Sequence, residues 1–226
     1  MSIGRWRHVI RSQAAEAAVV KGGGCIPAHF QIKYNHTQRA AGKAARGKEG
    51  LFMNEAMNVL LQRRSCRNYK PEQIKEEELQ AVLQAGIYAP TAGGRQSPII
   101  VAVQDKDTID QLRRMNAQIM GNPEADPFYG APTVLIVLAD LNSANRVYDG
   151  SCVMDNLMNA AEAVGLGSCW IHRAKQEFEY DEGKALLKQW GVEGEYEGVG
   201  HCVLGYWAEE KPAPAPRKDG YIYYVR

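Results

Sequence analysis

A dense group of basic residues in this 226-residue chain lies in the stretch LQRRSCRNYKP, residues 61–71. If the backbone is extended after a helix, alternate side chains point to one side, which places Arg63, Ser65 and Arg67 together. Two guanidinium forks and a hydroxyl match the oxygens of a phosphate group. The same cations could instead form a solvated helix end, where basic side chains complement the helix dipole, or they could contact nucleic acid.

The distribution of charge disfavours nucleic acid. Residues 1–52 hold nine Lys/Arg against two Asp/Glu, a balance of +7, whereas residues 53–226 hold 18 against 24, a balance of −6. The basic stretch is the only dense cluster in this acidic part, and a nucleic-acid-binding domain usually has a broader basic face. We therefore expect no nucleic-acid partner.

Three further stretches have residue types suited to a ligand site. In YAPTAGGRQSP, residues 88–98, two glycines would let backbone amides approach a flat ligand, while Thr91 and Gln96 could add hydrogen bonds. The ordinary interpretation is a helix-to-strand loop, where Gly and Pro are common. GLGSCWIH, residues 165–172, turns sharply from a helix into a strand, and PRKDG, residues 216–220, adds two late cations.

Several common sites are absent from the sequence. No GxGxxG follows a strand and no GxxxxGK[ST] occurs, so neither a Rossmann dinucleotide site nor a P-loop is expected. Cys169 and His172, with His201 and Cys202, could be imagined as a zinc set. Alternation along a strand would point Cys169 and His172 in opposite directions, so we expect core residues and no metal.

Helices and strands alternate along the chain after residue 53 and must position these stretches. Apolar spacing predicts helices over 54–64, 76–88, 106–120, 149–164 and 181–190, and strands over 97–105, 133–140, 168–172 and 199–207. This order indicates α+β or α/β layers. The helix over 149–164 is apolar nearly all round, so its second face must be covered by this domain or by a partner. The terminal YIYYVR, residues 221–226, has β-propensity but no adjacent partner, and it could add to the edge of another subunit's sheet.

Residues 1–52 lack any such pattern. They could be a basic nucleic-acid arm, an organellar transit peptide, or translation from upstream of the true start. We favour a mis-assigned start, because the codons for residues 48–50 can spell a ribosome-binding sequence just before Met53. We expect this extension to be disordered or loosely helical and to have no chemical role.

Composition limits the setting of the protein. No run of 18 apolar residues exists, so we expect no membrane partner. The five cysteines form an odd set without CxxC spacing, and two of them, Cys152 and Cys169, lie in apolar stretches. Reduced thiols of this kind indicate a reducing compartment, the cytoplasm.

The motifs RRSxR, APTAxxxQ, GLGSCWI and PRK, in this order and at these distances, resemble the FMN-dependent nitroreductase family. The resemblance covers essentially all of residues 54–226. It implies a single FMN-binding domain over 53–226 with an α+β fold, a three-layer α/β/α sandwich. Its sheet would be mixed and mostly antiparallel, with a swapped C-terminal strand in a homodimer.

The resemblance also implies a site. The residues that would hold the FMN phosphate and ribityl chain are Arg63, Arg64, Ser65 and Arg67. Those near the isoalloxazine, from the neighbouring subunit, would be Pro90, Thr91, Ala92 and Gln96. Ser168 and Cys169 would pass along the flavin, and Arg217 or Lys218 would reach the phosphate. The family often has Asn where this chain has Gly94, so one side-chain hydrogen bond would be missing or made by backbone.

The implied activity is a flavin oxidoreductase. It would take hydride from NADH or NADPH onto FMN and pass two electrons to a small, electron-poor acceptor such as a nitroaromatic or quinone. No side-chain acid or base can be named. Phe128 and Tyr129 could form a lid over the slot or a hydrophobic clip. Alternatives are a non-catalytic flavin-binding redox sensor, or a same-fold enzyme for dehalogenation or flavin fragmentation.

Overall fold

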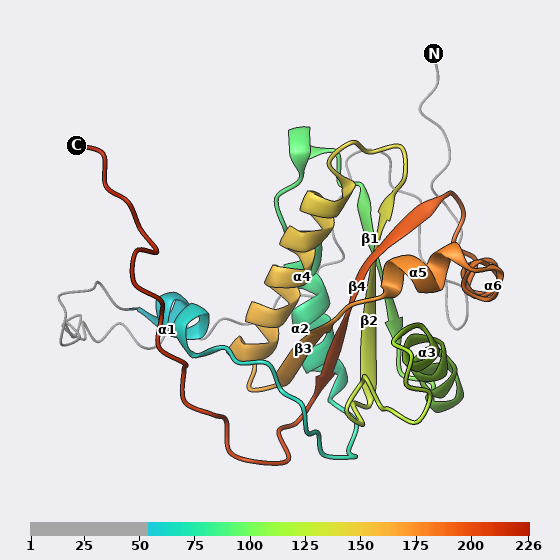
Figure 1. Cartoon of the computed structure of the whole chain (residues 1–226), viewed down its shortest axis with the longest axis horizontal. Helices are drawn as coiled ribbons and strands as arrows, with labels where there is room; N and C mark the ends of the chain where they lie inside the picture. Colours follow the sequence, from blue (N-terminus) through green and yellow to red (C-terminus); the bar gives the residue numbers. More distant parts are fainter. Residues whose placement is uncertain (1–53) are drawn as a thin grey trace, which may run out of the picture. The chain divides into compact units, whose positions relative to one another are not determined.

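A four-stranded antiparallel sheet forms the centre of the computed structural model, which describes residues 54–226. The expectations for residues 1–52 therefore lie outside the described part. The strands run in the order β1 (Pro98–Val103), β2 (Thr133–Asp140), β4 (Tyr196–Gly205) and β3 (Gly167–Ile171), as Figure 1 shows. Each neighbouring pair is antiparallel. The sheet is thus antiparallel throughout its named strands, where a mixed, mostly antiparallel sheet was expected.

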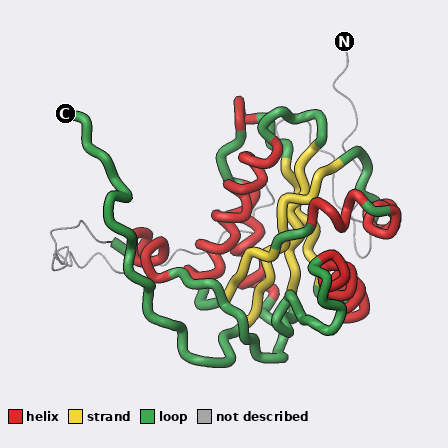
Figure 2. The backbone as a smooth tube through the Cα atoms, in the orientation of Figure 1, coloured by secondary structure: helices red, strands yellow, loops and turns green. Residues whose placement is uncertain are grey.

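Helices cover both faces of the sheet, which gives three layers (Figure 2). The elements on one face are α2 (Glu76–Ile87) and α4 (Arg146–Ala163), and those on the other are α3 (Lys106–Ile119), α5 (Ala174–Glu179) and α6 (Asp181–Gln189). The short α1 (Glu55–Gln62) contacts α4 and buries none of its residues. The predicted α+β sandwich is confirmed, but α5 was not expected, because six residues are too few to show a helical period.

Helices and strands begin at other residues than predicted where the apolar pattern is interrupted. β2 spans the predicted residues, and its first seven residues are all buried. β4 begins three residues earlier than expected, because a bulge near Val199 shifts its register against β2 and obscures the alternation. α4 likewise begins at Arg146, three residues before the apolar pattern predicts.

The apolar helix α4 is covered within the chain. Val153, Met154 and Leu157 are buried in one cluster with Leu79 and Val82 of α2. The central part of α4 therefore packs on α2 within the chain, whereas Val147 and Tyr148 in its first turn stay exposed. Coverage by this domain, one of the two alternatives that the sequence leaves open, therefore holds for the central part of the helix.

The C-terminal tail forms no strand in the single chain. Residues 212–226 are all exposed, and the side chain of Val225 is fully accessible. The structure contains one chain, so the swapped strand stays a prediction. Within residues 54–226, no helix is both long enough and apolar enough to cross a membrane.

Candidate functional site

The basic segment leaves α1 in an extended conformation and runs beside β3. Arg63 follows the last helical residue with φ −55° and ψ 131°. Ser65 forms an isolated parallel bridge with Ser168, and the Cys66 amide donates to the Ser168 carbonyl at 2.9 Å. The segment therefore lies against the first residues of β3, as the extended run in the sequence suggests.

Two further backbone hydrogen bonds join the same segment to the residues that follow β4. The Lys70 amide donates to the Tyr206 carbonyl at 2.9 Å, and the Ala208 amide donates to the Asn68 carbonyl at 3.1 Å. Within the segment, the buried Tyr69 hydroxyl donates to the Cys66 carbonyl at 3.0 Å. The backbone of residues 65–70 is thus held between β3 and the chain that follows β4.

The side chains of this segment gather around Cys169. Burial raises the pKa of the Cys169 thiol, and Arg67, the Ser65 hydroxyl and Arg63 partly offset that rise. The bridge between Ser65 and Ser168, the neighbour of Cys169, is the backbone contact that brings the basic segment to this thiol. The structure thus brings together Arg63, Ser65 and Arg67 with Ser168 and Cys169.

One atom of this group lacks a partner. The Nη1 of Arg63 is buried and has no hydrogen-bond acceptor among the described residues. A buried charged donor without an acceptor is costly, and an anion with several oxygens would satisfy it. The donor set therefore fits a phosphate group.

Arg64 has a different role. Its Nη1 donates to the carbonyls of Leu61 at 2.8 Å and Arg63 at 2.6 Å. These are the free carbonyls at the end of α1, so Arg64 caps the helix. The helix-end interpretation of the basic stretch is correct for this residue, while Arg63 and Arg67 lie toward Cys169.

The loop over residues 88–97 is shaped by its own hydrogen bonds. The Thr91 hydroxyl accepts from the Gln96 amide at 3.0 Å, so it is used inside the loop. The Ala92 amide donates to a carboxylate oxygen of Asp149 at 2.9 Å. A cavity of about 570 Å³ opens over this loop, with Pro90 and Gln96 among its lining residues. The sequence patterns did not single out Asp149, and its only signal was an acidic residue in the first turn of an apolar helix.

The loop and the basic segment lie at opposite ends of the sheet. Pro98, next to the loop, pairs with Ala139, which pairs with Glu197 of β4. Gly167, next to the basic segment, pairs with Gly205 at the other end of β4. Eight steps along β4 at ~3.3 Å each separate these positions by roughly 26 Å. The two groups are therefore not in contact with each other within one chain.

The late cations are exposed, and the two residues of the expected lid differ in burial. Arg217 and Lys218 lie in the exposed tail, where the Lys218 ammonium is 5.3 Å from the Tyr221 ring. Phe128 is 1% exposed and its ring centroid lies 5.2 Å from that of His201. Phe128 is therefore a hydrophobic clip that ties its loop to the core. Tyr129 beside it is partly exposed.

The fold and this donor set define a class of α+β proteins in which a basic segment leaves a helix end and lies against an edge strand of the sheet. The model of the Nitroreductase family matches residues 60–206, and the chain belongs to that family. The predicted family is confirmed.

Individual relatives agree with this assignment. A nitroreductase with bound FMN from Bacteroides fragilis is 28% identical with a TM-score of 0.72, and the match covers 77% of this chain and 100% of that one. A nitroreductase with bound FMN from Desulfitobacterium hafniense is 26% identical with a TM-score of 0.70, at the same coverage of 77% and 100%. An Archaeoglobus fulgidus protein, named provisionally as an NADH dehydrogenase/NAD(P)H nitroreductase, is 27% identical over 70% of this chain and 89% of its own.

Proposed function

We propose that the protein is an FMN-dependent oxidoreductase that takes electrons from NADH or NADPH and passes two of them to an electron-poor acceptor, such as a nitroaromatic or a quinone. The observation that carries the proposal is the buried, unpartnered Nη1 of Arg63 beside Ser65, Arg67 and the start of β3. Two structural neighbours, which are nitroreductases with bound FMN, support the choice of cofactor.

The residues of this chain would bind and orient the cofactor. Bound FMN would supply the hydride and electron transfer. Arg63 and Arg67 would neutralise its phosphate through charge-assisted hydrogen bonds, and the Ser65 hydroxyl would fill a remaining acceptor. The backbone hydrogen bonds of residues 66–70 would hold the segment that carries Ser65 and Arg67 in place without the ligand.

A second subunit would complete the site. Because the two groups of residues lie at opposite ends of the sheet, the loop must reach a flavin held by another chain. Large apolar side chains are exposed at the end of α2 and at the start of α4, namely Ile87, Tyr88, Val147 and Tyr148. These support a homodimer that buries more than ~2,000 Å². The cysteines at 66, 152, 169 and 202 are free thiols, which suits the cytoplasm.

The visible spectrum of the purified protein tests this function. We expect bound flavin at one FMN per subunit, bleaching under anaerobic NADH or NADPH, and recovery when a nitroaromatic or quinone is added. Protein without flavin would overturn the proposal. Stoichiometric FMN that neither nicotinamide reduces would instead favour a non-catalytic flavin-binding sensor.

A further inference from the structure

Asp149 binds both ends of the loop that follows α2. One carboxylate oxygen accepts from the Ala92 amide at 2.9 Å, and the other accepts from the Ser97 hydroxyl at 3.3 Å. Asp149 is 4% exposed and lies in the first turn of α4, where the helix dipole stabilises a carboxylate. Among the described residues, these are the hydrogen bonds that join residues 91–97 to α4.

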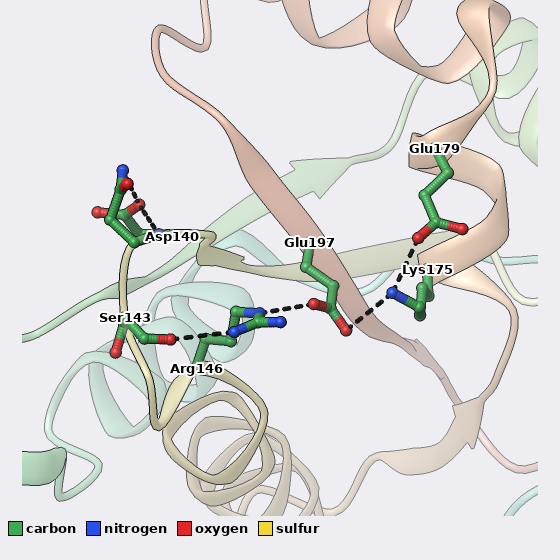
Figure 3. Close-up of polar contacts among 7 residues, drawn as sticks. Asp140, Ser143, Arg146, Lys175, Glu179 and Glu197 are labelled. Carbon is green, nitrogen blue, oxygen red and sulfur yellow. Dashed lines mark hydrogen bonds and ion pairs between the residues drawn. The ribbon is translucent and has the colours of Figure 1, made fainter.

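The turn that carries Asp149 is fixed to the sheet. Figure 3 shows Arg146, at the start of α4, bonded to Glu197 of β4, with Nε and Oε2 2.6 Å apart. One residue after Asp149, Gly150 packs so closely on Val199 that an added Cβ would lie 2.5 Å from Val199 Cγ2. Asp149 therefore projects from a turn that cannot shift easily, so its carboxylate is a rigid anchor.

The loop itself needs such an anchor. Gly93 and Gly94 have φ of 62° and 66°, and Gln96 has φ of 52°, which is strained for a residue with a side chain. Residues 93–96 are exposed and have little apolar contact of their own. A strained, exposed segment keeps one conformation only if neighbouring groups impose it.

We infer that Asp149 is a positioning residue that holds residues 91–97 in the conformation needed by the flavin of the neighbouring subunit. This inference rests on the proposed function, and it adds a residue that acts through the loop without touching the cofactor. Its carboxylate does this by accepting from one donor at each end of the loop.

Loop anchoring can be measured without the cofactor, because Arg95 offers trypsin a cleavage site at the centre of the exposed loop. Mass spectrometry measures the rate of tryptic cleavage after Arg95. We expect this rate to be about tenfold higher in Asp149→Ala than in the wild type, since two hydrogen bonds to a carboxylate are lost. Asp149→Asn keeps an acceptor for Ala92 and can bond Ser97, so it should restore most of the protection. Asp155→Ala, an exposed acid later in α4, is the matched control and should cleave like the wild type.

Flavin affinity then tests the link to function. We expect FMN to bind Asp149→Ala at least about tenfold more weakly, and the flavin that remains bound to this variant should show a changed visible circular dichroism. Asp149→Asn should bind FMN with an affinity close to that of the wild type. If Asp149→Ala does not fold, Ser97→Ala should still increase cleavage by a smaller factor, and unchanged cleavage in that variant would overturn the anchoring role.

The two proposals fail in different ways. Wild-type protein that binds FMN, together with Asp149→Ala that binds it equally well, would overturn the positioning role and leave the proposed function intact. Wild-type protein that binds no FMN would overturn both, even if cleavage after Arg95 responds to Asp149.

Discussion

The Cys66 amide donates a hydrogen bond of 2.9 Å to the Ser168 carbonyl, and this joins the segment after α1 to the first residues of β3. The two residues are about a hundred positions apart in the chain. Their contact places the segment that carries Arg63 and Arg67 beside Cys169, and so groups these cations with the first residues of β3.

Replacing Arg63 and Arg67 together by Ala should yield folded, colourless protein. Each charge-assisted contact to the phosphate contributes roughly 1.5–3 kcal/mol, so the affinity for FMN should fall by at least about a hundredfold. Equilibrium dialysis with FMN measures it. Lys106→Ala with Arg114→Ala, two exposed cations of α3, controls for the change in net charge. Stoichiometric yellow flavin in the first double variant would show that the phosphate assignment is wrong.

Mixed dimers should recover one FMN site from two inactive chains. One chain carries Arg63→Ala and Arg67→Ala, and the other carries Ala92→Trp, which puts a bulky ring where the flavin would lie. If the arginines and the loop act across the interface, one site of each mixed dimer combines both intact parts. We expect one FMN per mixed dimer and none in either parent homodimer. A mixed dimer without flavin would place the whole site in one chain.

Deleting residues 213–226 should release flavin and weaken the dimer together. The deletion removes Arg217 and Lys218 as well as the exposed apolar residues 221–225. Sedimentation velocity and flavin content measure the two effects. Arg217→Ala with Lys218→Ala is the matched control, and it should reduce FMN affinity while the dimer remains. A truncated monomer that still holds FMN would contradict the exchange of C-terminal strands.

Glu197→Gln should remove part of the acid sensitivity of the fold. The bond from Arg146, followed by that from Lys175, lowers the pKa of the Glu197 carboxyl despite its burial. Its stabilisation is therefore complete above the unfolded pKa of about 4.3 and is lost as the pH falls through the lower folded value.

Urea unfolding between neutral pH and pH 3 measures this effect. The wild type should lose about 1–2 kcal/mol more than Glu197→Gln over that window. Glu193→Gln, an exposed acid outside the ion pairs of the described residues, should follow the wild type. Parallel curves for wild type and Glu197→Gln would contradict the prediction.

Protein that starts at Met53 should match the full chain in flavin content, subunit assembly and thermal midpoint. The reason is that the family match begins at residue 60 and the residues of the site follow it. Calorimetry and flavin content on both forms check the expectation. A loss of folding on deletion would show that residues 1–52 are a structural element and would rule out the hypothesis of a mis-assigned start.

The sequence by itself determined the elements whose pattern is local. β2 was predicted at its observed bounds, because an apolar run of strand length has few other uses in a layered domain. The common side of Arg63, Ser65 and Arg67 follows from the two-residue period of an extended chain. Both conclusions depend only on neighbours in sequence.

Only the tertiary structure decided which of these pieces meet. The register of the sheet places residues 91–97 and residues 63–67 at opposite ends, and no local pattern encodes a register between strands that are far apart in the chain. The contacts of Asp149 could not be predicted for the same reason, since its two partners lie more than 50 positions earlier. Composition and periodicity describe what a segment buries, whereas long-range hydrogen bonds depend on where the folded chain brings a donor to an acceptor.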